Sequence, residues 1–246
     1  MTGHRNSSIV ERLDAAHTAS SMCGLVILVI VCWTGISSAQ VPPSSPDEAG
    51  YTGLLAAASR GDAARIKTLA ASGATVDVRD VRGRTPLHVA AFGGHHAVLR
   101  ALVAAGANPN ALENDRYDIV TIAAVANDVE TLKVSLTLGA NAKNVTSRYD
   151  GTALIAAAHL GHVEVVRVLI GADAPLDHVN NLDWTAVIEA IVLGDGGPRH
   201  TETLRALVEA GANVNIPDGN GQSPLGLARA RGYSAMVELL RRTGAR

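Results

Sequence analysis

The sequence predicts an all-α solenoid built from about six copies of one helix-turn-helix-hairpin unit. Two observations support this prediction: residues that begin helices recur at a regular spacing, and residues that end helices recur independently at the same spacing. The composition agrees. Of the 246 residues, 47% are hydrophobic but only 3% are aromatic. Such a chain suits small, closely stacked helices better than a β-sandwich, which is rich in aromatic residues.

Helix-start residues recur at intervals of 33, 33, 34, 33 and 38 residues. They are threonine, serine or aspartate residues, whose side chains can cap the first amides of a helix. They are Thr52, Thr85, Asp118, Thr152, Thr185 and Ser223. The approximate units that they define are 47–79, 80–112, 113–146, 147–179, 180–217 and 218–246.

Helix-stop residues give the same period from a second landmark, with intervals of 33, 33, 34, 38 and 33 residues. They are Gly73, Gly106, Gly139, Asp173, Gly211 and Gly244, and glycine is the residue that most readily ends a helix in the left-handed conformation. The single excess of five residues falls inside the fifth unit, near 195–199. We expect a flexible extension between two helices there.

The second unit is the most complete. Thr85 and Pro86 begin a first helix of about two turns, and Leu99 and Leu102 belong to the apolar face of a second helix. The segments Thr85-Pro86-Leu87-His88-Val89-Ala90-Ala91 and Ala105-Gly106-Ala107-Asn108 resemble the ankyrin repeat. The resemblance extends over residues 50–246, and the chain is similar to exported bacterial ankyrin repeat proteins. It implies a scaffold that binds proteins rather than an enzyme.

The N-terminal part predicts export. An apolar region at residues 22–36 is too short to span a bilayer and is followed by Ser37-Ser38-Ala39, so we expect a signal peptide over 1–39 that is cleaved after Ala39. An uncleaved membrane anchor and a cytosolic protein are the alternatives, and translation could begin at Met1 or Met22. Both cysteines lie inside this segment, which agrees with an oxidising compartment. Residues 40–49, rich in Pro and Ser, predict a linker before the repeats at 50–246.

Charge and motifs argue against several function classes. A formal charge of −2 does not favour a nucleic-acid binder. No serine-nucleophile, phosphate-loop or dinucleotide motif occurs, and we expect no catalytic residue, cofactor or metal. We interpret His88 as a hydrogen-bonding residue of the turn framework. The glutamates Glu130, Glu164, Glu202 and Glu238 recur at unit spacing and predict a solvated outer stripe.

The candidate interaction residues are aromatic or basic residues at the hairpins and at the exposed ends of the first helices, which in this fold line a concave face. Aromatic residues and arginine dominate binding hot spots. The candidates are Tyr51, Arg84, Phe92, Tyr117, Tyr149, His159 and Trp184. The alternative is that the tyrosines and Trp184 only pack neighbouring hairpins together.

These observations predict a monomeric, non-catalytic scaffold, periplasmic or secreted, that binds a protein partner on its concave face. The partner could be a periplasmic enzyme that needs support. Two other functions remain open: a secreted effector that binds a host protein, and an enzyme that uses the 195–199 insertion as part of its site.

Overall fold

The computed structural model describes residues 40–246, so the predicted signal peptide lies outside the described residues. Within 40–246 the chain forms thirteen helices and no strand, with a single isolated β-bridge between Thr146 and Gly151. None of the helices in this range has the length and apolar character needed to cross a membrane. The predicted all-α solenoid is confirmed.

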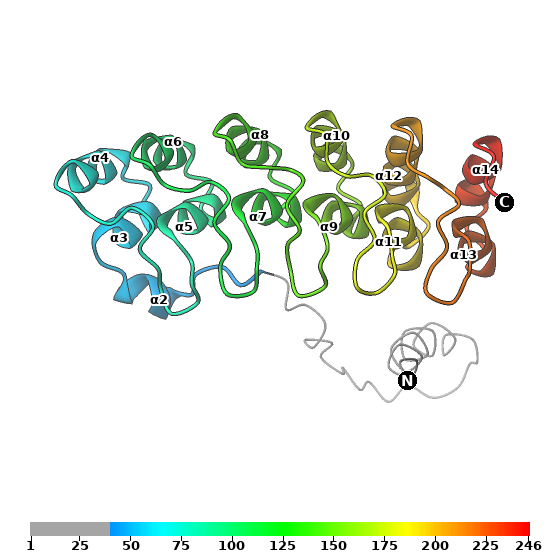
Figure 1. Ribbon diagram of the computed structural model, residues 1–246, viewed down its shortest axis with the longest axis horizontal. Coiled ribbons are helices and arrows are strands. Elements are labelled where there is room, and N and C mark those ends of the chain that lie inside the picture. The colour runs from blue at the N-terminus through cyan, green and yellow to red at the C-terminus, as the bar shows by residue number, and fades with distance from the viewer. Residues whose placement is uncertain (1–39) are drawn as a thin grey trace, which may run out of the picture. The chain divides into compact units, whose positions relative to one another are not determined.

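Six helix pairs follow one another along the solenoid, in two layers (Figure 1). The first-helix layer contains α3 (Gly53–Ser59), α5 (Pro86–Phe92), α7 (Ile119–Val125), α9 (Ala153–Leu160), α11 (Ala186–Val192) and α13 (Pro224–Ala230). The second-helix layer contains α4 (Ala63–Ala71), α6 (His96–Ala104), α8 (Val129–Thr137), α10 (Val163–Gly171), α12 (Pro198–Glu209) and α14 (Ser234–Arg242). Hairpin loops join successive pairs and extend beyond the first-helix layer.

Both sets of predicted landmarks occupy the expected positions. The six predicted start residues are the N-cap residues of the six first helices. The six predicted stop residues all have positive φ, including Asp173 at 58°, where glycine would be less strained. Local capping chemistry therefore sets the period of the array.

The core is a continuous row of side chains between the two layers. One position on the second helix is fully buried in five consecutive units, in a row that contains Ile66, Leu99, Leu132, Val166 and Leu204. Leu102, which we expected to point inward, is also fully buried. Each unit therefore buries its apolar stripe against its neighbours, as repeat arrays do.

Side chains near the start of four second helices reach back to a backbone carbonyl at the end of the preceding unit's first helix. Ring nitrogens of His95, His162 and His200 lie 3.1, 3.0 and 3.0 Å from the carbonyl oxygens of Ser59, Ala124 and His159, respectively. The Tyr233 hydroxyl donates to the Gly194 carbonyl at 3.0 Å. These contacts supply partners to carbonyls at the end of a first helix or, for Gly194, just beyond it.

The insertion in the fifth unit is more ordered than we predicted. Pro198 and Arg199 already belong to α12, which has 12 residues where the other five second helices have nine. Residues 195–197 form a turn in which the Gly197 amide donates to the Asp195 carboxylate at 2.9 Å. The Gly-rich stretch 194–197 lies between α11 and α12, as expected, whereas Pro198 and Arg199 lengthen α12.

The predicted linker at 40–49 is also folded. A short helix, α2 (Ser45–Gly50), begins at the N-cap Ser44, and Ser44 and Asp47 cap each other's backbone amides. The segment contacts the first two units through Asp47 and Glu48. We call residues 40–50 the N-terminal strap.

Candidate interaction surface

Three hairpins, in the second, fifth and sixth units, are built on a polar side chain at their first residue. The Asp80 carboxylate accepts from the amides of Arg82 and Arg84, both at 2.9 Å, and the Asp80 amide donates to the Arg84 carbonyl at 3.1 Å. Asn180 and Asp218 repeat this arrangement in the fifth and sixth units. The residue just before each N-cap therefore lies on the returning arm of the hairpin, and the two or three residues before it form the tip.

This geometry corrects four of the predicted interaction residues. Tyr51, Arg84, Tyr117 and Trp184 stand immediately before an N-cap, and they are only 9%, 1%, 8% and 5% exposed. These four side chains are buried and do not form exposed hairpin tips. The packing alternative, raised for the tyrosines and Trp184, fits Tyr51, Tyr117 and Trp184, while Arg84 is buried by polar contacts.

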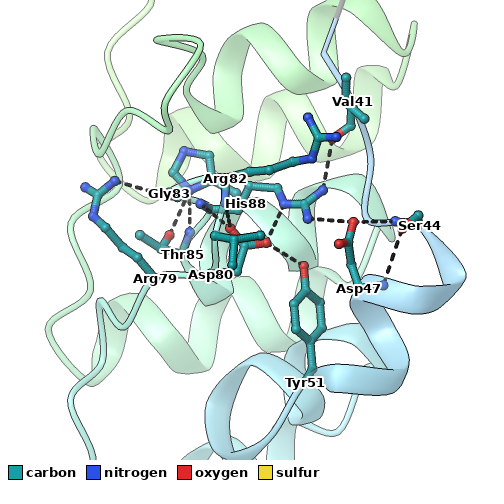
Figure 2. Close-up of polar contacts among 12 residues, drawn as sticks. Val41, Ser44, Asp47, Tyr51, Arg79, Asp80, Arg82, Gly83, Thr85 and His88 are labelled. Atoms are coloured by element: carbon teal, nitrogen blue, oxygen red, sulfur yellow. Dashed lines mark hydrogen bonds and ion pairs between the residues drawn. The ribbon is translucent and has the colours of Figure 1, made fainter.

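Arg84 is buried, but it is not apolar packing that holds it. Its Nε donates to Asp80 at 2.6 Å, its Nη2 to Asp47 at 2.9 Å, and its Nη1 to the Val41 carbonyl at 3.1 Å. The Tyr51 hydroxyl donates to the same Asp80 carboxylate at 2.7 Å (Figure 2). Two of the three acceptors of Arg84 belong to the N-terminal strap.

The groups around Arg84 have shifted pKa values. Hydrogen bonds from the Ser44 backbone and from Arg84 hold the pKa of Asp47 well below its usual range. Burial alone would raise the pKa of Asp80, but hydrogen bonds from Tyr51 and Arg84 outweigh it and lower that pKa. Burial and the bond to Asp80 raise the pKa of Tyr51. Both carboxylates therefore stay ionised around the guanidinium, as strong charge-assisted bonds require.

The hairpin tips of units 2 to 5 form a hydrogen-bonded ladder. The amides of Asn114, Ser147 and Asn181 donate to the carbonyls of Arg82, Arg116 and Tyr149 in the preceding hairpin, at 3.0, 3.1 and 2.9 Å. Each tip is therefore braced by its neighbour. A rigid row of tips can present side chains without a large ordering cost on binding.

Tyr149 lies on a true tip and is 44% exposed. The Arg148 guanidinium lies 5.8 Å from the centroid of its ring, within cation–π range. Next to it, Arg116 and Asp150 form an ion pair of 2.7 Å in which both side chains are 48% exposed. The third and fourth hairpins thus present an aromatic residue and exposed charges together.

The ends of the first helices supply the rest of this surface. His159 is exposed, and Phe92, Val125 and Val192 at matching positions are partly exposed. We call this surface, made of the hairpin tips and the ends of the first helices, the hairpin face. It is the face that we predicted to be concave.

A buried carboxylate that sequence reasoning missed lies at this face. Glu189 on α11 is 4% exposed and accepts from Asn180 at 3.0 Å. Its second oxygen, Oε2, lies 3.2 Å from Nδ1 of His159 and makes no hydrogen bond. The signal in the sequence was a glutamate inside the otherwise apolar run Ala186–Val192. His159 therefore partly covers a carboxylate at the junction of units 4 and 5.

The strap residue Asp47 was missed as well. Ser44 followed three residues later by Asp47, with Pro46 between them, is a helix-start pattern. The Pro/Ser-rich composition concealed it. No sequence pattern, however, links Asp47 to Arg84, which is 37 residues away.

His88 and His200 serve structural roles. In His88, Nδ1 lies 3.1 Å from the Thr85 amide nitrogen and 2.8 Å from its hydroxyl, while Nε2 lies 3.1 Å from the Tyr117 carbonyl oxygen, so the turn-framework interpretation is confirmed. Burial lowers the pKa of His88 to about 4. His200 contacts Asp195 through Nδ1 and the His159 carbonyl through Nε2, so neither nitrogen is available as a catalytic base. Over residues 40–246 no three His, Cys, Asp or Glu side chains converge as metal ligands would.

Comparison with known protein families gives one consistent match. A family model described as "Ankyrin repeats (3 copies)" matches residues 15–113 and 120–218, and a second, "Ankyrin repeats (many copies)", matches residues 198–241. Among curated proteins, the ankyrin repeat protein YahD of Escherichia coli (strain K12) is 32% identical over 192 residues, which is 78% of this chain and 95% of YahD.

Solved structures agree with the family match. An ankyrin repeat domain from Acinetobacter baumannii is 41% identical, with a TM-score of 0.74, and the match covers 78% of this chain and 98% of that domain. The ankyrin repeat domain of Bcl-3, a member of the IkappaB protein family, is 29% identical, with a TM-score of 0.72 and coverage of 80% and 88%.

Proposed function

Because the chain belongs to the ankyrin repeat family, whose members generally mediate protein–protein interaction, we propose that it is a non-catalytic scaffold that binds a protein partner on the hairpin face of units 3 to 5. The strap already occupies part of this face at units 1 and 2, through Ser59 and Arg84. While the strap is in place, the partner's footprint therefore lies on the later units.

The observation that supports the proposal best is Tyr149, a half-exposed aromatic ring on a braced hairpin tip with Arg148 over it. An exposed aromatic ring costs little side-chain entropy to immobilise, and aromatic residues with arginine are the usual anchors of protein interfaces. Tyr149 and His159 keep the role that the sequence suggested, and Phe92 lies on the same face closer to the strap.

The export proposal rests on the sequence alone. We propose a mature N-terminus at Gln40 and a periplasmic or secreted location, where the partner could be an enzyme that needs support. Sequencing the N-terminus of the protein isolated from its native host tests this. An N-terminus at Met1 or Met22 on a soluble cytosolic form would contradict it.

The interface is tested by capture from a periplasmic extract of the native host, with the full chain as bait. We expect Tyr149→Ala combined with His159→Ala to remove capture, since truncating an anchor typically costs about 2 kcal/mol, or roughly thirtyfold in affinity. The matched control is Glu130→Ala with Glu164→Ala, on the exposed outer stripe of the second helices. If the control loses capture and the aromatic variant keeps it, the partner binds the opposite face.

A further inference from the structure

The N-terminal strap is attached to the repeats mainly through polar contacts. No residue of α2 is buried. Besides the bonds from Arg84 to Asp47 and Val41, the Ser59 hydroxyl donates to Glu48 at 3.1 Å. A segment with few buried apolar contacts opens at a much lower free energy than the core of a protein. The strap can therefore leave the hairpin face while the helix pairs stay folded.

Unlike the strap, the Arg84 side chain is held in place by the repeats. Its Nε stays bonded to Asp80, which also holds the hairpin and the Tyr51 hydroxyl. Departure of the strap would leave Nη1 and Nη2, which now bond the Val41 carbonyl and Asp47, without protein acceptors. A guanidinium keeps its charge at any accessible pH, and its two freed nitrogens form their strongest hydrogen bonds with a carboxylate. The Arg84 guanidinium therefore favours a carboxylate as its ligand.

From these contacts we propose that Arg84 is a carboxylate-recognition site on the hairpin face, and that the strap is its exchangeable resident occupant. The competing occupant is an acidic segment of the partner protein. This inference rests on the proposed function, because it identifies one chemical feature of the partner that binds the hairpin face.

The strap itself shows what such a segment must contain. Asp47 lies in the first turn of a helix, where the Ser44 amide donates to it at 2.9 Å and orients its carboxylate toward Arg84. The residues before the helix run past Arg84, so that a backbone carbonyl, from Val41, meets the second nitrogen. The expected competitor is a Ser/Thr-x-x-Asp/Glu helix start preceded by an extended segment, which places one carboxylate and one carbonyl on the two nitrogens.

The test uses the strap's own sequence as the probe. A fluorescent peptide with the sequence of residues 40–50, QVPPSSPDEAG, is titrated against the full-length chain and its Asp47→Asn variant, and binding is followed by anisotropy. The substituted asparagine retains an amide oxygen that can accept from Ser44 but has no charge for Arg84. We expect the Asp47→Asn chain to bind the peptide at least about tenfold more tightly than the wild-type chain does, the scale of one charge-assisted bond.

Two controls connect binding to Arg84. A peptide that carries asparagine in place of its aspartate should bind the Asp47→Asn chain at least about tenfold more weakly. Arg84→Lys, which keeps the charge but loses the bidentate fork, should weaken binding of the aspartate peptide when it is combined with Asp47→Asn. If Arg84→Lys does not fold, as circular dichroism would show, the comparison of the two peptides decides the question.

The inference is overturned if the Asp47→Asn chain does not bind the peptide, if both chains bind it equally, or if the aspartate of the peptide makes no difference. Because this assay needs no partner, its failure is distinguishable from failure of the capture experiment, which tests the hairpin face of units 3 to 5 through Tyr149 and His159.

Discussion

The two ends of the described array share one kind of joint, in which His95 or Tyr233 bonds a carbonyl of the preceding unit, but they differ in what is added to it. At units 1 and 2, the strap adds a charged contact around Arg84 and buries none of its helix residues. At units 5 and 6, the Tyr233 hydroxyl bonds the Gly194 carbonyl, and its ring lies where a side chain on Gly196 would sit. The helix that follows Tyr233, α14, buries Met236 and Leu240. The comparison teaches that the strap is attached by charge without buried helix residues, whereas the last unit is attached by a packed ring and its hydrogen bond.

We expect the largest loss of stability from a substitution in the core. Leu102 on α6 is fully buried, so Leu102→Ala should lower the free energy of unfolding by about 2–5 kcal/mol through lost burial and a cavity. Chemical denaturation followed by circular dichroism measures the loss. Because units couple only to their neighbours, a central lesion can also separate the transition into two steps. A change below about 0.5 kcal/mol would mean that the second helices do not hold the array together.

A pH titration of stability tests the joint between units 2 and 3. The folded pKa of His88, about 4, is below its ordinary value of 6.5, so folding favours the neutral ring. The stability it contributes is fully present above pH 6.5 and is lost as pH falls toward 4, by about 3 kcal/mol in total. In His88→Gln, which has no titrating group at this position, the difference between pH 7 and pH 4 should shrink by that amount. An unchanged pH profile would contradict a buried neutral His88.

Weakening the contact between units 5 and 6 should lower the free energy of unfolding by a smaller amount. Tyr233→Phe removes the hydroxyl that donates to the Gly194 carbonyl and leaves the ring in place. We expect a loss of about 1 kcal/mol, the typical net worth of one hydrogen bond. Thermal or chemical unfolding measures it, and hydrogen exchange should show the loss concentrated in α13 and α14. A loss spread evenly over the array would argue against independent joints.

Weakening the strap should change the stability of the whole array least of all. Asp47→Asn breaks the ion pair with Arg84, yet α2 contributes no buried residue. We expect no measurable shift in the denaturation midpoint, together with clearly faster hydrogen exchange at residues 45–50. If the midpoint falls as far as it does in Leu102→Ala, the strap is part of the core, and the contrast between the two ends disappears.

Sequence reasoning located the helices better than the surface. The N-cap residues and the stop residues act locally, through their own side chains and backbone angles, so Thr85 or Gly106 can be recognised without knowledge of the fold. Whether Trp184 or Tyr149 is exposed depends on how the hairpin folds back on itself. That follows from the bonds of Asn180 and its equivalents, which helical periodicity does not describe.

Contacts between distant units were harder still to predict. Arg84 had the right chemistry for a binding residue, but part of what it binds is the chain's own strap, through a residue 37 positions earlier. His200 restores in the lengthened unit the contact to the preceding first helix that His95 and His162 make elsewhere. A single sequence contains these residues but does not show which distant residues they contact.

The central claim is that a protein partner binds the hairpin face of units 3 to 5. Hydrogen–deuterium exchange of the captured complex tests it most directly. The account predicts slower exchange at the tips, residues 114–116, 147–150 and 181–183, and at the end of α9, with unchanged exchange in the second helices α8 and α10. Slower exchange confined to α8 and α10, with unprotected tips, would contradict it.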